Sequence, residues 1–138
     1  MTSTISMQDM RHLNLFESVT RIRTRFCFRY NETIFFCVPK TFLFKAIGKE
    51  GRNIKKISQI LGKRIRIIPI PQDEKHAKEF IRAIVSPIEF NDLDIKGSEV
   101  ILTAGSRNKA ALLGRNKRRL AEMQVIINDF FGKEFRIV

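Results

Sequence analysis

The sequence predicts an α+β fold in which two small modules follow each other, each in the order helix, strand, strand, helix, helix, strand. The first observation is that helical spacing of the apolar residues and the alternation of strands replace each other repeatedly along the 138 residues. The second is an internal repeat: segments 38–48 and 104–114 each lead to a glycine, and an apolar residue, Ile54 or Leu120, follows six positions later in both. Spacing this regular indicates a duplicated unit.

The first module begins with an amphipathic helix, expected over residues 6–20 from its apolar side chains every three or four positions. Two strands are expected next, about a turn near Asn31, because large side chains alternate there with smaller or polar ones. One face of this hairpin is expected to carry Phe26, Phe28, Tyr30, Ile34, Phe36 and Val38. The other face is expected to carry Phe35 and Cys37 among polar side chains.

Helical spacing returns after the second strand. Residues 42–47 and 52–61 are interpreted as two short helices, joined by segment 48–51 with a glycine at either end. Gly62 stands where a C-terminal cap is expected, and residues 64–68 supply a third strand that two prolines terminate.

The second module repeats this order. Its expected elements are a helix over 74–85, strands over 88–95 and 99–103, a short helix over 107–113, a long helix running through Leu120 to Phe131, and a strand over 135–138. We therefore assign residues 1–71 to the first module, with 1–7 disordered, and residues 72–138 to the second.

Basic residues are concentrated in two zones. The chain has a net charge of +12 and a pI of about 10.3. Residues 40–66 contribute +8 and residues 107–138 contribute +5, whereas residues 72–99 contribute −3. This distribution favours a polyanionic partner, which could be RNA, DNA or an anionic membrane, over a surface that serves solubility alone.

A membrane-spanning protein is not expected, because no apolar run approaches the roughly 20 residues needed to cross a bilayer. Residues 1–8 also lack the basic and apolar regions of a secretion signal. These observations favour a cytoplasmic protein.

Patterns typical of metal sites and catalysis were not found. Cys27 and Cys37 are too few for a disulfide framework, and His12 and His76 have no Cys or acid at ligand spacing. A Ser-His-Asp set and a nucleotide-binding lysine loop are both missing, and the acidic group at 89–94 is typical of a solvated strand. We expect no metal, no cofactor and no enzymatic activity.

The segment Gly48-Lys49-Glu50-Gly51 lies between two predicted helices inside the more basic zone. Glycine tolerates positive φ and lets a foreign backbone come close, and the amides that open the next helix favour an anion. A structural bend between helices would explain the two glycines alone nearly as well. The order of elements, the repeat and the charge together match the KH module, whose Gly-x-x-Gly loop clamps about four nucleotides of a single strand.

Two sets of residues are therefore expected to contact single-stranded RNA. They are Lys45, Ile47, Gly48, Lys49, Glu50, Gly51, Arg52, Asn53, Lys55, Lys56, Arg64 and Arg66 in the first module, and Gly114, Arg115, Asn116, Lys117 and Arg118 in the second. Most of the 12 phenylalanines are assigned to packing, and base stacking is an alternative role for Phe35, Phe42 and Phe44.

Four segments resemble the archaeal NusA-like transcription factors: 15–20 in the first helix, 46–55 around the loop, 61–63 at the end of the next helix and 79–81 in the second module. The resemblance covers nearly the whole chain. It implies two tandem KH modules of the type II topology, without the further domains of bacterial NusA. It also implies RNA contact during transcription elongation or termination, near RNA polymerase, by a protein that we expect to be monomeric.

The second module departs from this pattern, because its loop reads Gly114-Arg115-Asn116-Lys117 and lacks the second glycine. The helix that follows is also about one turn longer than its counterpart. Close approach of an RNA backbone is then in doubt. Neighbouring basic residues could compensate by charge, giving a weaker contact, or the second module could chiefly brace the first.

Two other functions compete with a transcription factor. A ribosome-associated or ribosome-assembly KH protein would hold folded rRNA on the same basic surfaces. A protein-interaction platform would instead use the strand face that carries Phe35 and Cys37.

Overall fold

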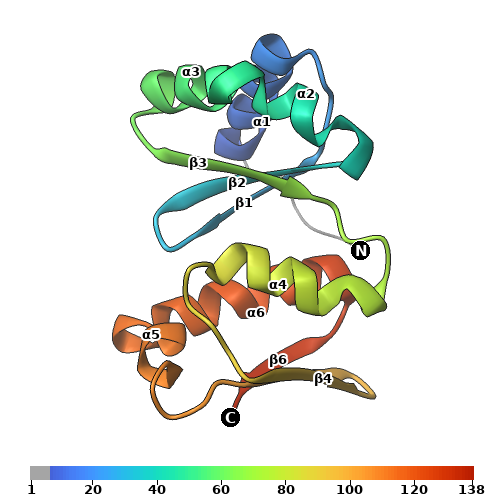
Figure 1. Ribbon diagram of the computed structural model, residues 1–138, viewed down its shortest axis with the longest axis vertical. Coiled ribbons are helices and arrows are strands. Elements are labelled where there is room, and N and C mark those ends of the chain that lie inside the picture. Colours follow the sequence, from blue (N-terminus) through green and yellow to red (C-terminus); the bar gives the residue numbers. More distant parts are fainter. Residues whose placement is uncertain (1–6) are drawn as a thin grey trace. The chain divides into compact units, whose positions relative to one another are not determined.

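The computed structural model describes residues 7–138, and the chain divides into two compact units between Ile70 and Pro71. Each unit holds a three-stranded sheet accompanied by helices, with strand orders β1-β2-β3 and β4-β5-β6 (Figure 1). The predicted α+β class is confirmed, and the architecture is consistent with a KH-like fold. The disorder expected for residues 1–7 falls outside the described residues except at Met7, which begins the first helix.

The first unit has the predicted order of elements. They are α1 (Met7–Thr20), β1 (Phe26–Tyr30), β2 (Thr33–Val38), α2 (Leu43–Ile47), α3 (Arg52–Leu61) and β3 (Arg64–Pro69), with short 3₁₀ turns at Lys40–Phe42 and Lys49–Gly51. β2 pairs antiparallel with β1 and parallel with β3. Gly62 ends α3 in the left-handed conformation, as expected of a C-terminal cap.

The expected assignment of side chains to the two hairpin faces was wrong. The turn between β1 and β2 has two residues, Asn31 and Glu32, both with positive φ, and Phe28 pairs directly with Phe35. Directly paired residues share a face, so the aromatic residues of β1 lie on the face of Phe35, where the Phe28 and Phe35 rings stack with centroids 5.1 Å apart. The number of residues in the turn decides which residues of the two strands face the same side of the sheet. The sequence pattern alone places the turn only approximately.

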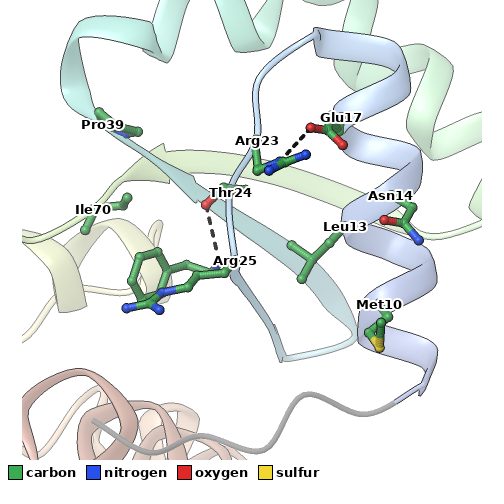
Figure 2. A pocket seen from close by; sticks show the side chains of 10 residues that line it. Met10, Leu13, Asn14, Glu17, Arg23, Thr24, Arg25, Pro39 and Ile70 are labelled. Atoms are coloured by element: carbon green, nitrogen blue, oxygen red, sulfur yellow. Dashed lines mark hydrogen bonds and ion pairs between the residues drawn. The ribbon is translucent and has the colours of Figure 1, made fainter.

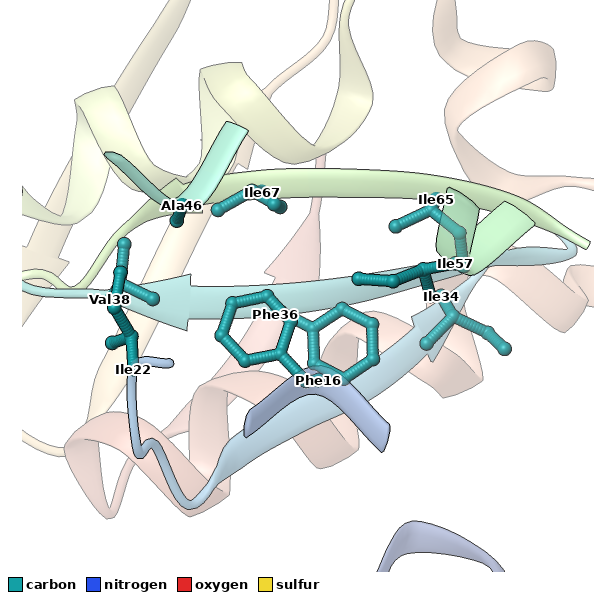
Figure 3. Close-up of a cluster of buried hydrophobic side chains, with 9 residues drawn as sticks. All are labelled: Phe16, Ile22, Ile34, Phe36, Val38, Ala46, Ile57, Ile65 and Ile67. Atoms are coloured by element: carbon teal, nitrogen blue, oxygen red, sulfur yellow. The ribbon is translucent and has the colours of Figure 1, made fainter. Parts of the chain in front are cut away.

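The core of the first unit lies between its sheet and its three helices (Figure 3). Its buried members are Phe16, Ile22, Ile34, Phe36, Val38, Ala46, Ile57, Ile65 and Ile67. At its centre the ring of Phe16 from α1 stacks on that of Phe36 from β2, with centroids 4.5 Å apart. α3 is therefore fixed on the sheet, and the loop before it starts from a rigid base.

The other face of β2 is buried as well. Phe35 and Cys37 are 1% and 0% exposed. Base stacking by Phe35 and a protein-interaction face at both residues stay predictions.

The second unit repeats the arrangement. Its elements are α4 (Ala77–Val85), β4 (Asp92–Lys96), β5 (Glu99–Thr103), α5 (Lys109–Leu113), α6 (Arg118–Phe131) and β6 (Glu134–Ile137), with 3₁₀ turns at Glu74–His76 and Arg115–Lys117. β5 pairs antiparallel with β4 and parallel with β6. β4 begins four residues later than the predicted Ile88, because its pairing starts at Asp92 opposite Thr103, where β5 ends.

His12 is buried in α1, with 7% of its surface exposed. Burial lowers the pKa of this imidazole below its usual value, with Arg29 acting in the same direction and Asp9 opposing it. The unfolded chain then binds a proton at His12 more readily than the folded one, so protonation favours unfolding.

We expect the free energy of unfolding to fall as pH decreases from about 7.5 through the ordinary histidine range near 6.5. The His12→Gln variant should lose less stability over the same interval, since it has no proton to bind at that position. Urea titrations of both proteins at each pH provide the measurement. Equal pH dependence in the two proteins would contradict a buried neutral His12.

Candidate nucleic-acid interface

The loop between α2 and α3 has a backbone that only certain residues adopt readily. Gly48 has φ 81° and ψ 164°, and Gly51 is left-handed with φ 73°. Between them Glu50 is also left-handed, with φ 57°. The amide of Gly48 donates to the carbonyl of Phe44 at 3.0 Å, and the amide of Gly51 donates to the carbonyl of Gly48 at 3.1 Å. The loop is thus a tight, hydrogen-bonded turn that leads directly into α3.

The first glycine is required by the protein itself. A Cβ atom at Gly48 would lie 3.0 Å from the side chain of Asn53. That side chain donates from Nδ2 to the carbonyls of Lys45 and Ala46, at 3.2 and 3.0 Å, and so satisfies the C-terminal end of α2. Asn53, predicted as an RNA contact, has its amide occupied within the protein and positions the loop.

The second glycine has a different role. A Cβ atom at Gly51 would meet no atom within 4 Å, so nothing in the protein fills the space beside it. Lys49 and Glu50 are exposed, and the two glycines are half-buried. The loop is therefore open to an external ligand. The backbone of such a ligand could come close to the main chain at Gly51, because no side chain stands between them.

A groove of about 600 Å³ runs from the loop along α3. Its lining residues are Lys49, Glu50, Arg52, Lys55, Lys56 and Gln59. The helical members recur every three or four residues, so they share one face of α3. Among residues 7–138, no partner forms an ion pair with any of the four basic residues of the groove. Mutual repulsion of these cations is relieved when an anion binds.

Arg64 and Arg66 do not join this group. They alternate along β3 with Ile65 and Ile67, which pack in the core beneath the helices, so the arginines face the other side of the sheet. The guanidinium of Arg66 lies over the ring of Phe35, 5.5 Å from its centroid. The remaining predicted contacts of the first unit lie at or next to the loop, and Lys45 is exposed on α2.

The loop of the second unit has nearly the same backbone. Gly114 has φ 77° and ψ 169°, Asn116 has φ 56°, and Lys117 adopts φ 57° where the first unit has Gly51. Arg119 takes the place of Asn53: its Nη1 atom donates to the carbonyl of Ala111 at 3.0 Å, and its side chain lies against Gly114. The turn is thus preserved without its second glycine, and Arg115, Asn116, Lys117 and Arg118 are all exposed.

A second cavity of about 580 Å³ in the first unit is less suited to an anion (Figure 2). Its walls come from α1, from the segment before β1 and from Pro39 and Ile70, and they include apolar Met10 and Leu13. Arg23 is held by an ion pair with Glu17 at 2.9 Å, so its charge is balanced. Its other cation, Arg25, lies 5.4 Å from the centroid of the Phe26 ring, so this cavity has one described cation without an ion pair where the α3 groove has four.

The fold also brings together three potential metal ligands that sequence spacing had not suggested. Ligand atoms of Asp9, His12 and Cys27 all lie within 4.8 Å of one another, because α1 packs beside β1. Burial raises the pKa of the Cys27 thiol to about 12, so it is protonated at neutral pH, and the Arg29 charge acts on both His12 and Cys27. A metal bound here would have to displace the thiol proton and would be repelled by the Arg29 charge.

Among the helices of residues 7–138, none has the length and apolar character required to cross a membrane. No protein-family model matches the chain.

Several archaeal proteins are similar to the chain. It is 31% identical to the probable transcription termination protein NusA of Methanococcus vannielii, over 97% of this chain and 79% of that protein. Proteins of the same name from Methanocaldococcus jannaschii and Halococcus morrhuae are 26% and 25% identical, over 84% and 94% of this chain and 64% and 97% of their own lengths. The crystal structure of APE1850 is similar in fold, with a TM-score of 0.65 at 22% identity over 96% of this chain and 99% of that one. The chain belongs to the archaeal family of NusA proteins.

Proposed function

We propose that the protein is a non-enzymatic transcription factor that binds single-stranded RNA through the Gly48–Gly51 loop. In this proposal both units are KH modules of the type II topology, and the protein acts as a cytoplasmic monomer in elongation or termination. The names of its archaeal relatives support the role in transcription. The repeated strand order, with a glycine loop between two helices in each unit, supports the assignment of the modules.

The observation that carries this proposal is the open space beside Gly51, next to four basic side chains without ion-pair partners among the described residues. A phosphate placed there meets main-chain amides at the start of α3, and the positive end of the helix dipole favours it. Lys49 and Arg52 add full charges at the same end. Lys55 and Lys56 then continue the charge along the helix, so a strand can be followed over several nucleotides.

The second unit contributes a weaker contact in this proposal. Its loop keeps the backbone conformation, but the Cβ of Lys117 stands where the first loop is bare. An RNA strand is then held at longer range by the charges of the basic side chains, and not by close approach to the main chain.

We expect the affinity for a single-stranded oligonucleotide to fall steeply with salt. Each phosphate contact to a single strand contributes a slope of about −0.7 in log K against log[salt], so four contacts predict a loss of about 50-fold between 50 and 200 mM. Fluorescence anisotropy with an unstructured RNA of about ten nucleotides measures this slope. A flat titration would argue against phosphate recognition by the groove.

The complex with which the protein is recovered from cell extracts distinguishes a transcription factor from a ribosomal protein. We expect the tagged protein to be recovered with RNA polymerase from nuclease-treated extracts, since the proposal places it near the transcript at the polymerase. Stable co-sedimentation with ribosomal subunits after a high-salt wash, without polymerase, would support the ribosomal alternative instead.

A further inference from the structure

Only two of the 12 phenylalanines are exposed, and both come just before the glycine loop. Phe44 on α2 is 87% exposed and Phe42, in the preceding 3₁₀ turn, is 45% exposed. The other rings are buried or half-buried. Exposure this complete is unusual for so large an apolar side chain, which ordinarily gains by leaving water.

The position of Phe44 follows from the short helix that carries it. Leu43 and Ala46 face the core, and Ala46 is fully buried, so Phe44 and Lys45 lie on the outer face of α2. The carbonyl of Phe44 accepts the amide of Gly48 at 3.0 Å, which places the residue one helical turn before the loop. The outer face of α2 therefore leads directly into Gly48 and Lys49.

The ring of Phe44 has no ring or cation contact with any described residue. Both of its faces are available to a planar partner. Its neighbours are exposed cations, Lys45 in the same helix and Lys49 in the loop. An apolar flat surface beside basic side chains is the combination that proteins use to hold single-stranded nucleic acids, with bases on the rings and phosphates on the cations.

We propose that Phe44 stacks on an unpaired nucleobase of the RNA strand whose phosphate backbone lies against the Gly48–Gly51 loop. The inference rests on the proposed function and adds a base-binding position to it. Stacking on a phenyl ring uses the π-face that every base has, so the contact discriminates little between sequences. It does discriminate between single strands and duplexes, in which the base faces are covered by their neighbours.

The Phe44→Ala variant should bind a single-stranded oligonucleotide about 5- to 150-fold more weakly, the range found for removing one stacked ring. Its salt dependence should keep the slope of the unmodified protein, because no phosphate contact is lost. Val125→Ala is a matched control: Val125 is 62% exposed on α6 of the other unit, and its removal should leave the affinity unchanged.

A second variant reports the contact directly. The chain contains no tryptophan, so Phe44→Trp introduces a single tryptophan at the proposed position, and its emission can be excited selectively in the presence of Tyr30. We expect this variant to bind at least as tightly and its emission to be quenched when the oligonucleotide is added. A duplex of the same sequence should quench it far less.

Unchanged RNA affinity of Phe44→Ala, together with unquenched emission of Phe44→Trp in the bound state, would overturn the inference. If Phe44→Ala instead loses polymerase recovery and keeps its RNA affinity, the ring is a protein contact and the inference is again wrong. A variant in which Lys49 and Glu50 are replaced tests the proposed function separately. If that variant loses RNA binding, the loop still binds RNA and only the stacking by Phe44 is wrong.

Discussion

Replacement of Lys49 and Glu50 together by aspartate is expected to abolish binding to single-stranded RNA while the first unit remains folded. Both side chains are exposed, and Lys49 has no ion-pair partner among the described residues. Glu50 has a φ of 57°, and aspartate is one of the residues that tolerate this left-handed conformation. The substitution therefore changes the charge that faces the phosphate with little change in the backbone.

The expected loss is at least about 100-fold, because a charge-assisted hydrogen bond of about 1.5–3 kcal/mol is removed and a repulsion replaces it. Anisotropy titrations at fixed salt measure the affinity, and circular dichroism with thermal unfolding checks the fold. An affinity within a few-fold of the unmodified protein would remove the loop from the mechanism.

The Lys63→Asp variant is the matched control for this experiment. It changes the net charge by the same amount in the same unit, at the far end of α3. The ten residues of α3 span about 15 Å, which exceeds the Debye length of about 8 Å at physiological salt. Lys63→Asp should therefore lose only a small part of the affinity. An equal loss in both variants would mean that net charge, and not the loop, governs binding.

The order of elements could be predicted because it depends on local patterns. The spacing of the apolar residues can be recognised from a few neighbouring residues, and so can the glycines at 48, 51, 62 and 114. The structure has the corresponding helices, strands and helix ends at these places. The faces of the first hairpin could not be obtained in this way, because one residue more or less in the turn exchanges them. The alternation of Arg64 and Arg66 with Ile65 and Ile67 did carry the signal that the arginines face away from the helices.

The internal role of Asn53 and the cluster of Asp9, His12 and Cys27 were beyond such patterns. Asn53 acts on carbonyls seven and eight residues earlier, across a change in chain direction. His12 and Cys27 come together only when α1 lies beside β1. Contacts of this kind require the tertiary packing of elements, which periodicity does not specify. The openness of Gly51 likewise depends on what the rest of the unit leaves uncovered.

Gly51→Lys is expected to weaken RNA binding by about 10-fold or more although it adds a positive charge to the groove. The chain itself shows that lysine can occupy this position, because Lys117 holds φ 57° in the equivalent loop. A left-handed lysine costs about 1–2 kcal/mol, which the lower entropy of the unfolded chain partly offsets, so the free energy of unfolding should fall by only about 0.5–1 kcal/mol. The fold is kept, and the new side chain fills the space that a phosphate strand would use.

The reciprocal substitution, Lys117→Gly, separates strain from binding. It relieves the left-handed lysine and should raise the free energy of unfolding by about 0.5–1 kcal/mol, measured by urea denaturation. If charge alone drew RNA to these loops, Gly51→Lys would bind more tightly and Lys117→Gly more weakly, in step with the charge. If the main chain must be bare at the first loop, Gly51→Lys binds more weakly in spite of its charge. The sign of that one change therefore decides whether the second glycine of the loop serves recognition or only the turn.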